Sequence, residues 1–292
     1  MGVANLMELA DANTLGNLLS SVASPAFVKT PVMMNHVHAE NMPSGTNVLK
    51  LRKKDFLTAA ALAESTVLAP DANGELVEGS LAVSVTATKC AVVSGLTLEE
   101  QKFGDIDFNR VGDEHFTAIG RFVDNDALSL FSGLSTSVTA ASVMTVDDIM
   151  LAQMTIYAGN VPSQNADLTF VGAPRAVYNI KKEMIQGGNA AFTNPAMLDV
   201  FRGEPVKANG FIGKIPGVCD VYQTTGLATS GGDDVNALFH PMWTFGGIFD
   251  SAPLTWVTNV GAGGFYTEIA SAYFHDIAEW NDAAGVKILS DT

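Results

Sequence analysis

The chain has 292 residues, and only 16% of them are Asp, Glu, Lys or Arg, against about 25% in a typical soluble domain. Its formal net charge of −15 opposes electrostatic binding to DNA, RNA or an anionic membrane. No apolar run is long enough for a transmembrane helix, and the first residues lack the features of secretion and myristoylation signals. So few charges on so long a chain indicate a surface that is buried against partners or covered by small polar side chains.

Charged residues are unevenly distributed along the chain. Lys50, Arg52, Lys53 and Lys54 make up 4 of the 16 basic residues, whereas the stretch 55–126 holds 13 acidic and 4 basic residues. Two explanations remain open at this point. The charges either form an ordinary solvated surface, or the basic run contacts an acidic region on another copy of the chain.

Residues 1–45 are predicted to form an arm with little core of its own. Leucines between Leu6 and Leu19 indicate one or two short helices. Three prolines at positions 25, 31 and 43 then favour extended pieces, because the residue before a proline avoids the helical region.

Residues 46–95 predict a long β-hairpin. An outgoing run over 47–53 and a return run over 81–93 have an alternating pattern, and turn-forming residues at 70–74 separate them. Arms of about 10–15 residues would reach roughly 35–50 Å. Because an isolated two-stranded ribbon is only marginally stable in water, the hairpin must pack along the body or lie on a neighbour.

Helices and strands alternate in the rest of the chain. A long amphipathic helix is predicted over 105–130, and a second one begins at Thr145 with Asp148 in the capping-box position and ends at Gly159. A buried strand over 167–171 leads into a helix that opens at Pro174. The remaining predicted elements are a short helix over 195–201, strands over 218–222 and 254–260, and a final strand pair over 273–279 and 286–289 with a closing turn at 281–285.

The sequence does not predict a nucleotide site. The stretch Gly261–Gly264 resembles the start of a dinucleotide-binding loop, but Tyr266 occupies the position of the third glycine and no βαβ unit follows. We therefore expect no cofactor.

Neither the histidines nor the cysteines predict a metal centre. His36 and His38 lie on one side of a predicted strand and are a candidate metal pair, although ordinary surface or hydrogen-bonded histidines explain them better. Cys90 and Cys219 are too few for a disulfide framework or a zinc site, so we expect reduced thiols. The other histidines, at positions 115, 240 and 275, have no carboxylate or cysteine at ligand spacing.

Acidic pairs and tryptophans have structural explanations. The pairs Asp105/Asp107 and Asp147/Asp148 stand where helices are predicted to begin, and a third pair, Asp233/Asp234, follows a glycine-rich turn. The three tryptophans, at positions 243, 256 and 280, are best explained as core or interface anchors. No catalytic constellation is left, and we expect the protein not to be an enzyme.

The order of the predicted parts resembles the major capsid proteins of tailed bacteriophages, which have the Hong Kong 97-type fold. The similar stretches are 45–53 (GTNVLKLRK), 57–64, 84–94 (SVTATKCAVVS), 167–174 (DLTFVGAP) and 209–219 (NGFIGKIPGVC), together with the long helix at 105–130. The resemblance implies an α+β chain with an N-terminal arm (1–45), an extended hairpin called the E-loop (46–95), a P-domain with a spine helix (96–134), an α/β A-domain (135–255) and P-domain return strands (256–292).

The resemblance also implies a function. Such a chain would self-assemble into the pentamers and hexamers of an icosahedral phage head that encloses double-stranded DNA without sequence-specific binding. Its Lys50, Arg52, Lys53 and Lys54 would meet an acidic patch on a neighbour. Its partners would be copies of itself, with a separate scaffolding protein or none, a portal and decoration proteins, and no membrane. It would assemble in the host cytoplasm and reside in the virion.

Two other functions remain open. A bacterial encapsulin shell has the same fold and differs in its cargo. A nucleotide-binding α/β enzyme built around Gly261–Gly264 belongs to another class altogether.

Overall fold

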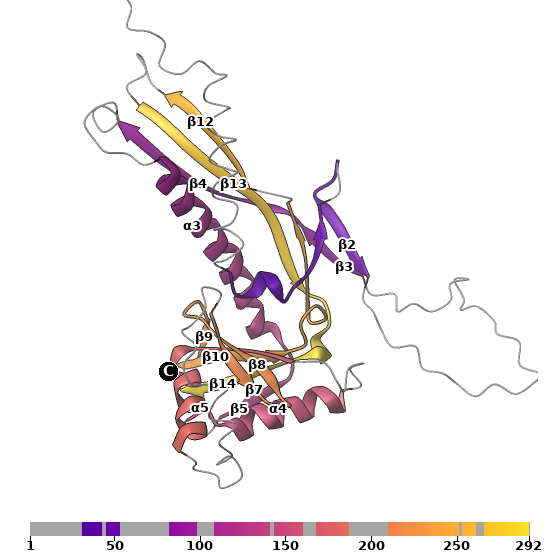
Figure 1. Ribbon diagram of the computed structural model, residues 1–292. Coiled ribbons are helices and arrows are strands. Elements are labelled where there is room, and N and C mark those ends of the chain that lie inside the picture. The colour runs from indigo at the N-terminus through magenta and orange to yellow at the C-terminus, as the bar shows by residue number, and fades with distance from the viewer. Residues whose placement is uncertain are drawn as a thin grey trace, which may run out of the picture.

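The computed structural model describes residues 31–42, 45–52, 82–97, 108–140, 143–159, 168–186, 210–250, 253–260 and 266–291. Two β-sheets and one long helix, α3 (Phe108–Ser129), form its frame (Figure 1). None of the helices in these ranges is long and apolar enough to cross a bilayer.

The long sheet is built around β13 (Tyr266–Glu279). On one side β13 pairs with β4 (Thr88–Thr97), and on the other side it pairs first with β12 (Leu254–Val260) and then with β11 (Phe245–Phe249), all antiparallel. A short strand, β1 (His38–Asn41), adds to β11 in parallel.

Helix α3 lies along one face of this sheet (Figure 1). Its apolar stripe, which includes Phe116, Ile119 and Val123, is fully buried against residues of β4 and β13 such as Cys90 and Tyr273. The apolar residues whose periodicity predicts this helix are therefore the ones that pack it against the sheet. Burial of such side chains contributes about 1.5–3 kcal/mol each.

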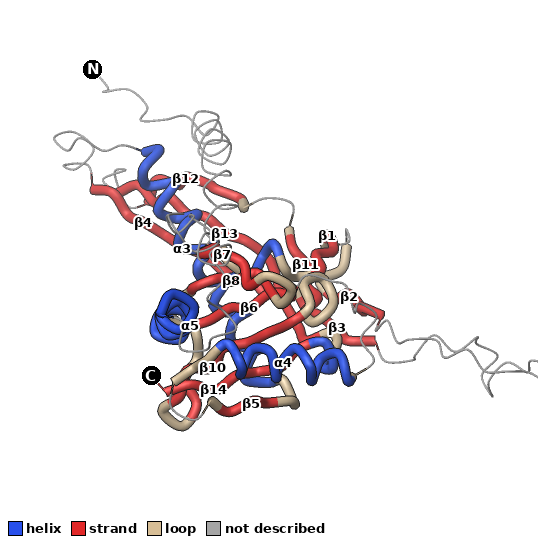
Figure 2. The backbone as a smooth tube through the Cα atoms, turned by 60° about the horizontal axis from the view of Figure 1, so that its bottom comes forward, coloured by secondary structure: helices blue, strands red, loops and turns tan. Residues whose placement is uncertain are grey.

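The second sheet has seven strands with β10 (Asp233–Phe239) near its centre. Its other strands are β5 (Ser137–Thr139), β6 (Leu168–Gly172), β7 (Phe211–Ile215), β8 (Cys219–Gln223), β9 (Thr229–Ser230) and β14 (Gly285–Asp291). Helices α4 (Val146–Ala158) and α5 (Pro174–Gln186) share one apolar cluster with one face of this sheet, and Figure 2 shows α4 crossing near β10, β14 and β5. The opposite face packs on the C-terminal end of α3 and the 3-10 helix η2 (Leu130–Gly133).

Helix α4 begins and ends as predicted. The Thr145 hydroxyl accepts the N–H of Asp148, and the Asp148 carboxylate accepts the N–H of Thr145, which completes a capping box. The helix ends at Ala158, where Gly159 is the C-cap. The predicted helices over 105–130 and from Pro174 and the strands at 167–171, 218–222 and 254–260 are likewise confirmed.

The final predicted strand pair is wrong. Strands β13 and β14 both form, but β13 belongs to the long sheet and β14 lies between β10 and β5 in the second sheet. A 3-10 turn, η4 (Asp282–Ala284), separates them in place of a hairpin turn. The two strands diverge because Val286 and Ile288 of β14 bury their side chains in the cluster beneath α4 and α5.

The predicted hairpin is confirmed only near its base. β2 (Val48–Arg52) pairs antiparallel with β3 (Ala82–Thr86) over five residues. Beyond Ala87 the return run becomes β4 and pairs with β13, not with the outgoing run. The predicted turn at 70–74, the arm helices, the helix over 195–201, the Asp105/Asp107 pair and the glycine stretch 261–264 lie outside the described residues.

Candidate functional site

The base of the β2–β3 hairpin is fixed to the long sheet by an apolar contact. Leu51 is 1% exposed and packs with Ile248, Val85 and Trp280. Gly246 makes room for this leucine, because a Cβ at that position would lie 2.9 Å from its Cδ1 atom. The neighbouring side chains Val48 and Lys50 are exposed on the hairpin.

The four basic residues of the candidate assembly site are only partly described. Lys50 is exposed in the middle of β2 and Arg52 is the last residue of that strand, whereas Lys53 and Lys54 lie outside the described residues. The contact of these residues with an acidic patch on another copy stays a prediction.

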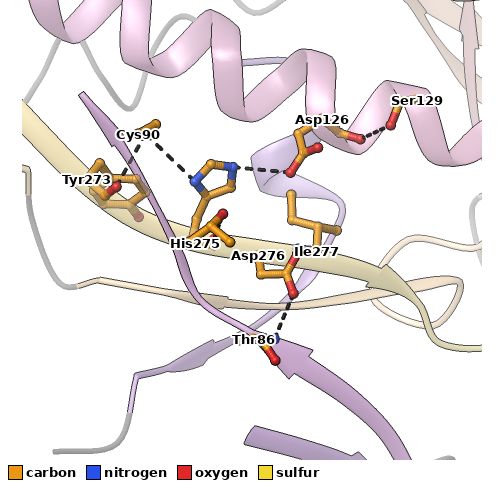
Figure 3. A network of polar contacts seen from close by, with 9 residues as sticks. Thr86, Cys90, Asp126, Ser129, Tyr273, His275, Asp276 and Ile277 are labelled. Carbon is orange, nitrogen blue, oxygen red and sulfur yellow. Dashed lines mark hydrogen bonds and ion pairs between the residues drawn. The ribbon is translucent and has the colours of Figure 1, made fainter. Parts of the chain in front are cut away.

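A network of polar contacts joins the hairpin, the long sheet and α3 where β4 begins (Figure 3). The imidazole of His275, on β13, is completely buried, with its Nε2 atom 3.3 Å from Oδ2 of Asp126 on α3. Its Nδ1 atom lies 3.8 Å from the Sγ atom of Cys90. Burial by itself would lower the pKa of His275, but the Asp126 carboxylate and the Cys90 sulfur raise it to about 9.

The next residue, Asp276, points to the other side of the strand. Its Oδ2 atom accepts the backbone N–H of Thr86 at 2.7 Å, at the end of β3. Its Oδ1 atom accepts the N–H of Ile277. Successive side chains of a strand alternate between faces, so one β13 segment holds α3 on one face and the hairpin base on the other.

A second histidine ties α3 to the long sheet. His115 lies between two hydroxyls, with Nε2 at 2.6 Å from Ser94 on β4 and Nδ1 at 3.1 Å from Ser271 on β13. Burial lowers the pKa of this imidazole, which favours its neutral form. His240 contacts the carbonyl of Pro241 through Nδ1.

The segment 31–42 crosses the molecule as part of the core. Val32, Met33 and Val37 are buried in the cluster around α3, and the Asp124 carboxylate accepts the N–H of Met33 at 2.7 Å. Met33 begins the 3-10 turn η1 (Met33–Asn35), whose C-cap is His36.

His36 and His38 are not brought together as a metal pair. The His36 ring is buried against Tyr222 with ring centroids 4.6 Å apart, whereas His38 stacks on Trp280. The turn at His36 rotates the two rings into different surroundings. Within the described ranges no group of three or more His, Cys, Asp or Glu side chains is placed to hold a metal ion.

The remaining candidates have structural positions. Asp147 and Asp148 lie in the first turn of α4, and Asp233 and Asp234 open β10 after a glycine turn. Cys90 and Cys219 are free and lie in different sheets. Trp280 is buried, Trp243 packs on the core of the second sheet, and Trp256 is exposed beneath the Lys89 ammonium.

Several large apolar side chains are exposed in two groups. On α4 they are Met150, Leu151 and Met154, and on the long sheet they are Val93, Leu254 and Trp256. The sheet group lies on the face turned away from α3, because Val93 and Trp256 are both opposite Ala270 of β13, one residue out of phase with Ser271. Exposed apolar groups of this kind mark surfaces that bind other proteins.

Comparisons with known proteins agree with this architecture. No protein-family model matches the sequence, and no curated protein sequence matches it. Solved structures do match: the capsid of the cyanophage P-SCSP1u has a TM-score of 0.64 at 11% identity, covering 90% of this chain and 89% of that one. The mature capsid of bacteriophage PhiM1 has a TM-score of 0.60 at 10% identity, covering 89% and 87%.

The chain has the Hong Kong 97-type fold. This capsid fold is shared with a protein shell of another kind, the SrpI encapsulin complex from Synechococcus elongatus, with a TM-score of 0.60, 10% identity and coverage of 100% of this chain and 92% of that one. The α+β class predicted from the sequence is thereby confirmed.

Proposed function

We propose that the chain is the major subunit of a tailed-phage head and self-assembles into the pentamers and hexamers of an icosahedral shell around double-stranded DNA. The observation that carries the proposal is the likeness to phage capsids over about nine tenths of the chain. The activity is assembly, driven by buried interface, and involves no reaction.

The surface of the chain supports self-association. Charged residues are few, and large apolar side chains such as Met154 and Leu254 are more than half exposed. Burial of apolar area against neighbouring copies would contribute about 25 cal/mol per Å². The parts of the arm (1–45) and of the E-loop (46–95) that lie outside segment 31–42 and strand β4 would reach the adjacent subunits, and the A-domain (135–255) would meet its counterparts around the capsomer axis.

Charge would determine how the E-loop is oriented on the neighbouring subunit. Lys50, Arg52, Lys53 and Lys54 would meet an acidic region of the neighbour, and the remaining negative charge of the inner wall would repel packaged DNA. The contact would weaken with salt because exposed charges are screened beyond about 8–10 Å at physiological ionic strength. The shell would form in the host cytoplasm with separate scaffolding, portal and decoration proteins.

Electron microscopy of the purified full chain, alone and with its scaffold, tests the proposal. We expect closed shells, and a monomer under all assembly conditions would overturn it. The charge contact is tested by Lys50→Gln with Arg52→Gln, against the matched control Arg110→Gln with Arg121→Gln on the exposed face of α3. The hairpin variant should assemble less at low salt and converge with wild type at high salt, and equal assembly of both double variants would refute the contact.

An encapsulin-type shell is the second candidate, because the SrpI encapsulin covers the whole of this chain. The contents of the particle decide between the two. Nuclease-protected DNA supports the phage head, whereas a folded protein bound inside by a short peptide supports the encapsulin.

A further inference from the structure

Strand β13 changes partners at residues 273–277, and three parts of the molecule meet there. Up to Ala272 it pairs with β12, and from His275 it pairs with β11. On its other edge, β4 begins opposite His275, at Thr88. Just before this point Ala87 donates its N–H to Asn47, at the foot of the hairpin. A movement of this segment would therefore be transmitted to both the long sheet and the hairpin.

The face turned toward α3 carries a charged contact. The groups that surround the His275 ring are Asp126 and Phe122 from α3, Cys90 from β4, and Tyr273 from β13 itself, whose hydroxyl is bonded to the Asp250 carbonyl near β11. Asp126 is the only carboxylate among these surrounding side chains. The Nε2 atom is buried without an aligned hydrogen-bond acceptor in the described part of the chain, so its contact with Asp126 depends on opposite charges.

The face turned toward the hairpin carries a second anchor one residue later. Asp276 accepts the N–H of Thr86 at 2.7 Å, and Thr86 is the last residue of β3. In Figure 3 the His275 and Asp276 side chains leave the strand in opposite directions, one toward α3 and the other toward β3. One peptide unit thus connects the two anchors, and a rotation of the strand about its axis would move both.

We propose that His275 and Asp126 form a charge-dependent latch that sets the position of the hairpin base relative to α3. With the latch closed, β13 is held in the orientation that presents Asp276 to Thr86. Loss of the Asp126 charge leaves the buried imidazolium without a counter-charge, whereas loss of the imidazolium charge removes the attraction that holds His275 to the partly exposed Asp126. In both cases the segment 273–277 loosens.

The direction of the pH dependence follows from the charge that closes the latch. The pKa of His275 is raised to about 9 in the folded chain from 6.5, so its imidazole is charged at neutral pH. The stabilisation is complete below the ordinary pKa and is lost as the pH rises through about 9. The latch opens at alkaline pH and stays closed in mild acid.

The test uses the full chain and two local readouts. The first is hydrogen exchange at the Thr86 amide, corrected for the intrinsic effect of pH. The second is the alkylation rate of Cys90, with Cys219 as an internal control because it is buried in the other sheet. The variants are Asp126→Asn and His275→Gln, and the matched control is Asp113→Asn, which removes an exposed carboxylate from the same helix.

We expect both latch variants to speed Thr86 exchange and Cys90 alkylation roughly tenfold near neutral pH, with Cys219 and the control unchanged. In wild type Thr86 exchange should accelerate between about pH 8 and 10, and in His275→Gln it should not. Unchanged rates overturn the latch. Faster Cys90 alkylation without faster Thr86 exchange overturns the coupling to the hairpin. Equal acceleration of Cys219 alkylation means global unfolding and overturns the latch. The readouts need no assembly, so the latch stands or fails separately from the proposed function.

Discussion

The carboxylate of Asp124, on α3, accepts the backbone N–H of Met33 at 2.7 Å across 91 residues of sequence. Burial raises the pKa of this carboxyl to about 6, against the opposing effect of the N–H groups of Met33 and Val32. The helix therefore holds segment 31–42, within the arm, through a carboxyl whose pKa of about 6 is close to neutral pH.

Replacement of Asp124 by Asn should make stability less dependent on pH. The folded pKa of about 6 exceeds the ordinary 3.8, so the folded chain binds more protons and wild type loses stability as the pH rises between these values. The loss amounts to about 3 kcal/mol, and Asp124→Asn, whose amide oxygen can still accept the Met33 N–H, should avoid it. Urea unfolding at several pH values between about 4 and 7 measures the difference, and a constant gap between the two proteins would contradict the prediction.

His36 should have the opposite effect in the same pH range. Burial lowers its pKa to about 4 despite the nearby Asp220, so the folded chain keeps the ring neutral and loses stability as the pH falls from 6.5 toward 4. His36→Phe preserves the ring packing on Tyr222 and should remove about 3 kcal/mol of this acid-induced loss. If the unfolding curves of wild type and variant shift in parallel with acid, His36 is not the group responsible. Because Asp124 and His36 oppose each other, wild type should vary less with pH than either variant.

Leu51 should be the main apolar anchor of the hairpin. Its side chain is 1% exposed, and truncation to Ala leaves a cavity beside Ile248 and Trp280. Leu51→Ala should cost about 2–4 kcal/mol of unfolding free energy, whereas Val48→Ala, at a side chain that is 41% exposed, should change it by less than about 0.5 kcal/mol. Equal effects of the two truncations in urea unfolding would show that the hairpin base is not packed in this way.

Met154 should affect assembly and not folding. It is 62% exposed on α4, so Met154→Glu should leave the unfolding free energy within about 0.5 kcal/mol of wild type. If this surface is buried between copies, the new charge should strongly reduce light scattering in an assembly reaction. Ala118→Glu, which adds the same charge on the exposed face of α3, is the matched control. Normal assembly of Met154→Glu would place α4 outside the contacts between copies.

Local signals predicted the elements that local interactions determine. The capping box of Thr145 and Asp148 spans four residues, so the start of α4 is visible in the sequence. The stripe of α3 is visible because one face of the helix is buried along its length. The sequence predicts that His36 and His38 share one strand, whereas the structure places His36 at the end of the 3-10 turn η1. The alternating pattern around His38 gives no sign of this turn.

Pairings over long sequence distances could not be predicted in this way. The hairpin pattern predicts the pairing of β3 with β2, but the return run alternates on both sides of Ala87, so nothing in it reveals that β4 pairs with β13 instead. Contacts of His275 join it to Asp126 and to Cys90, 185 residues earlier, and no spacing rule covers such separations. Only the folded sheet brings these side chains together.

The division of one run between two sheets also has a mechanical consequence. A pull on the hairpin by a neighbouring subunit would reach the body through Ala87 and act along the axis of β4. The ten residue pairs between β4 and β13 would then carry the load in shear, with their hydrogen bonds perpendicular to the force and sharing it. Such a pull would therefore not peel β4 from the long sheet one bond at a time.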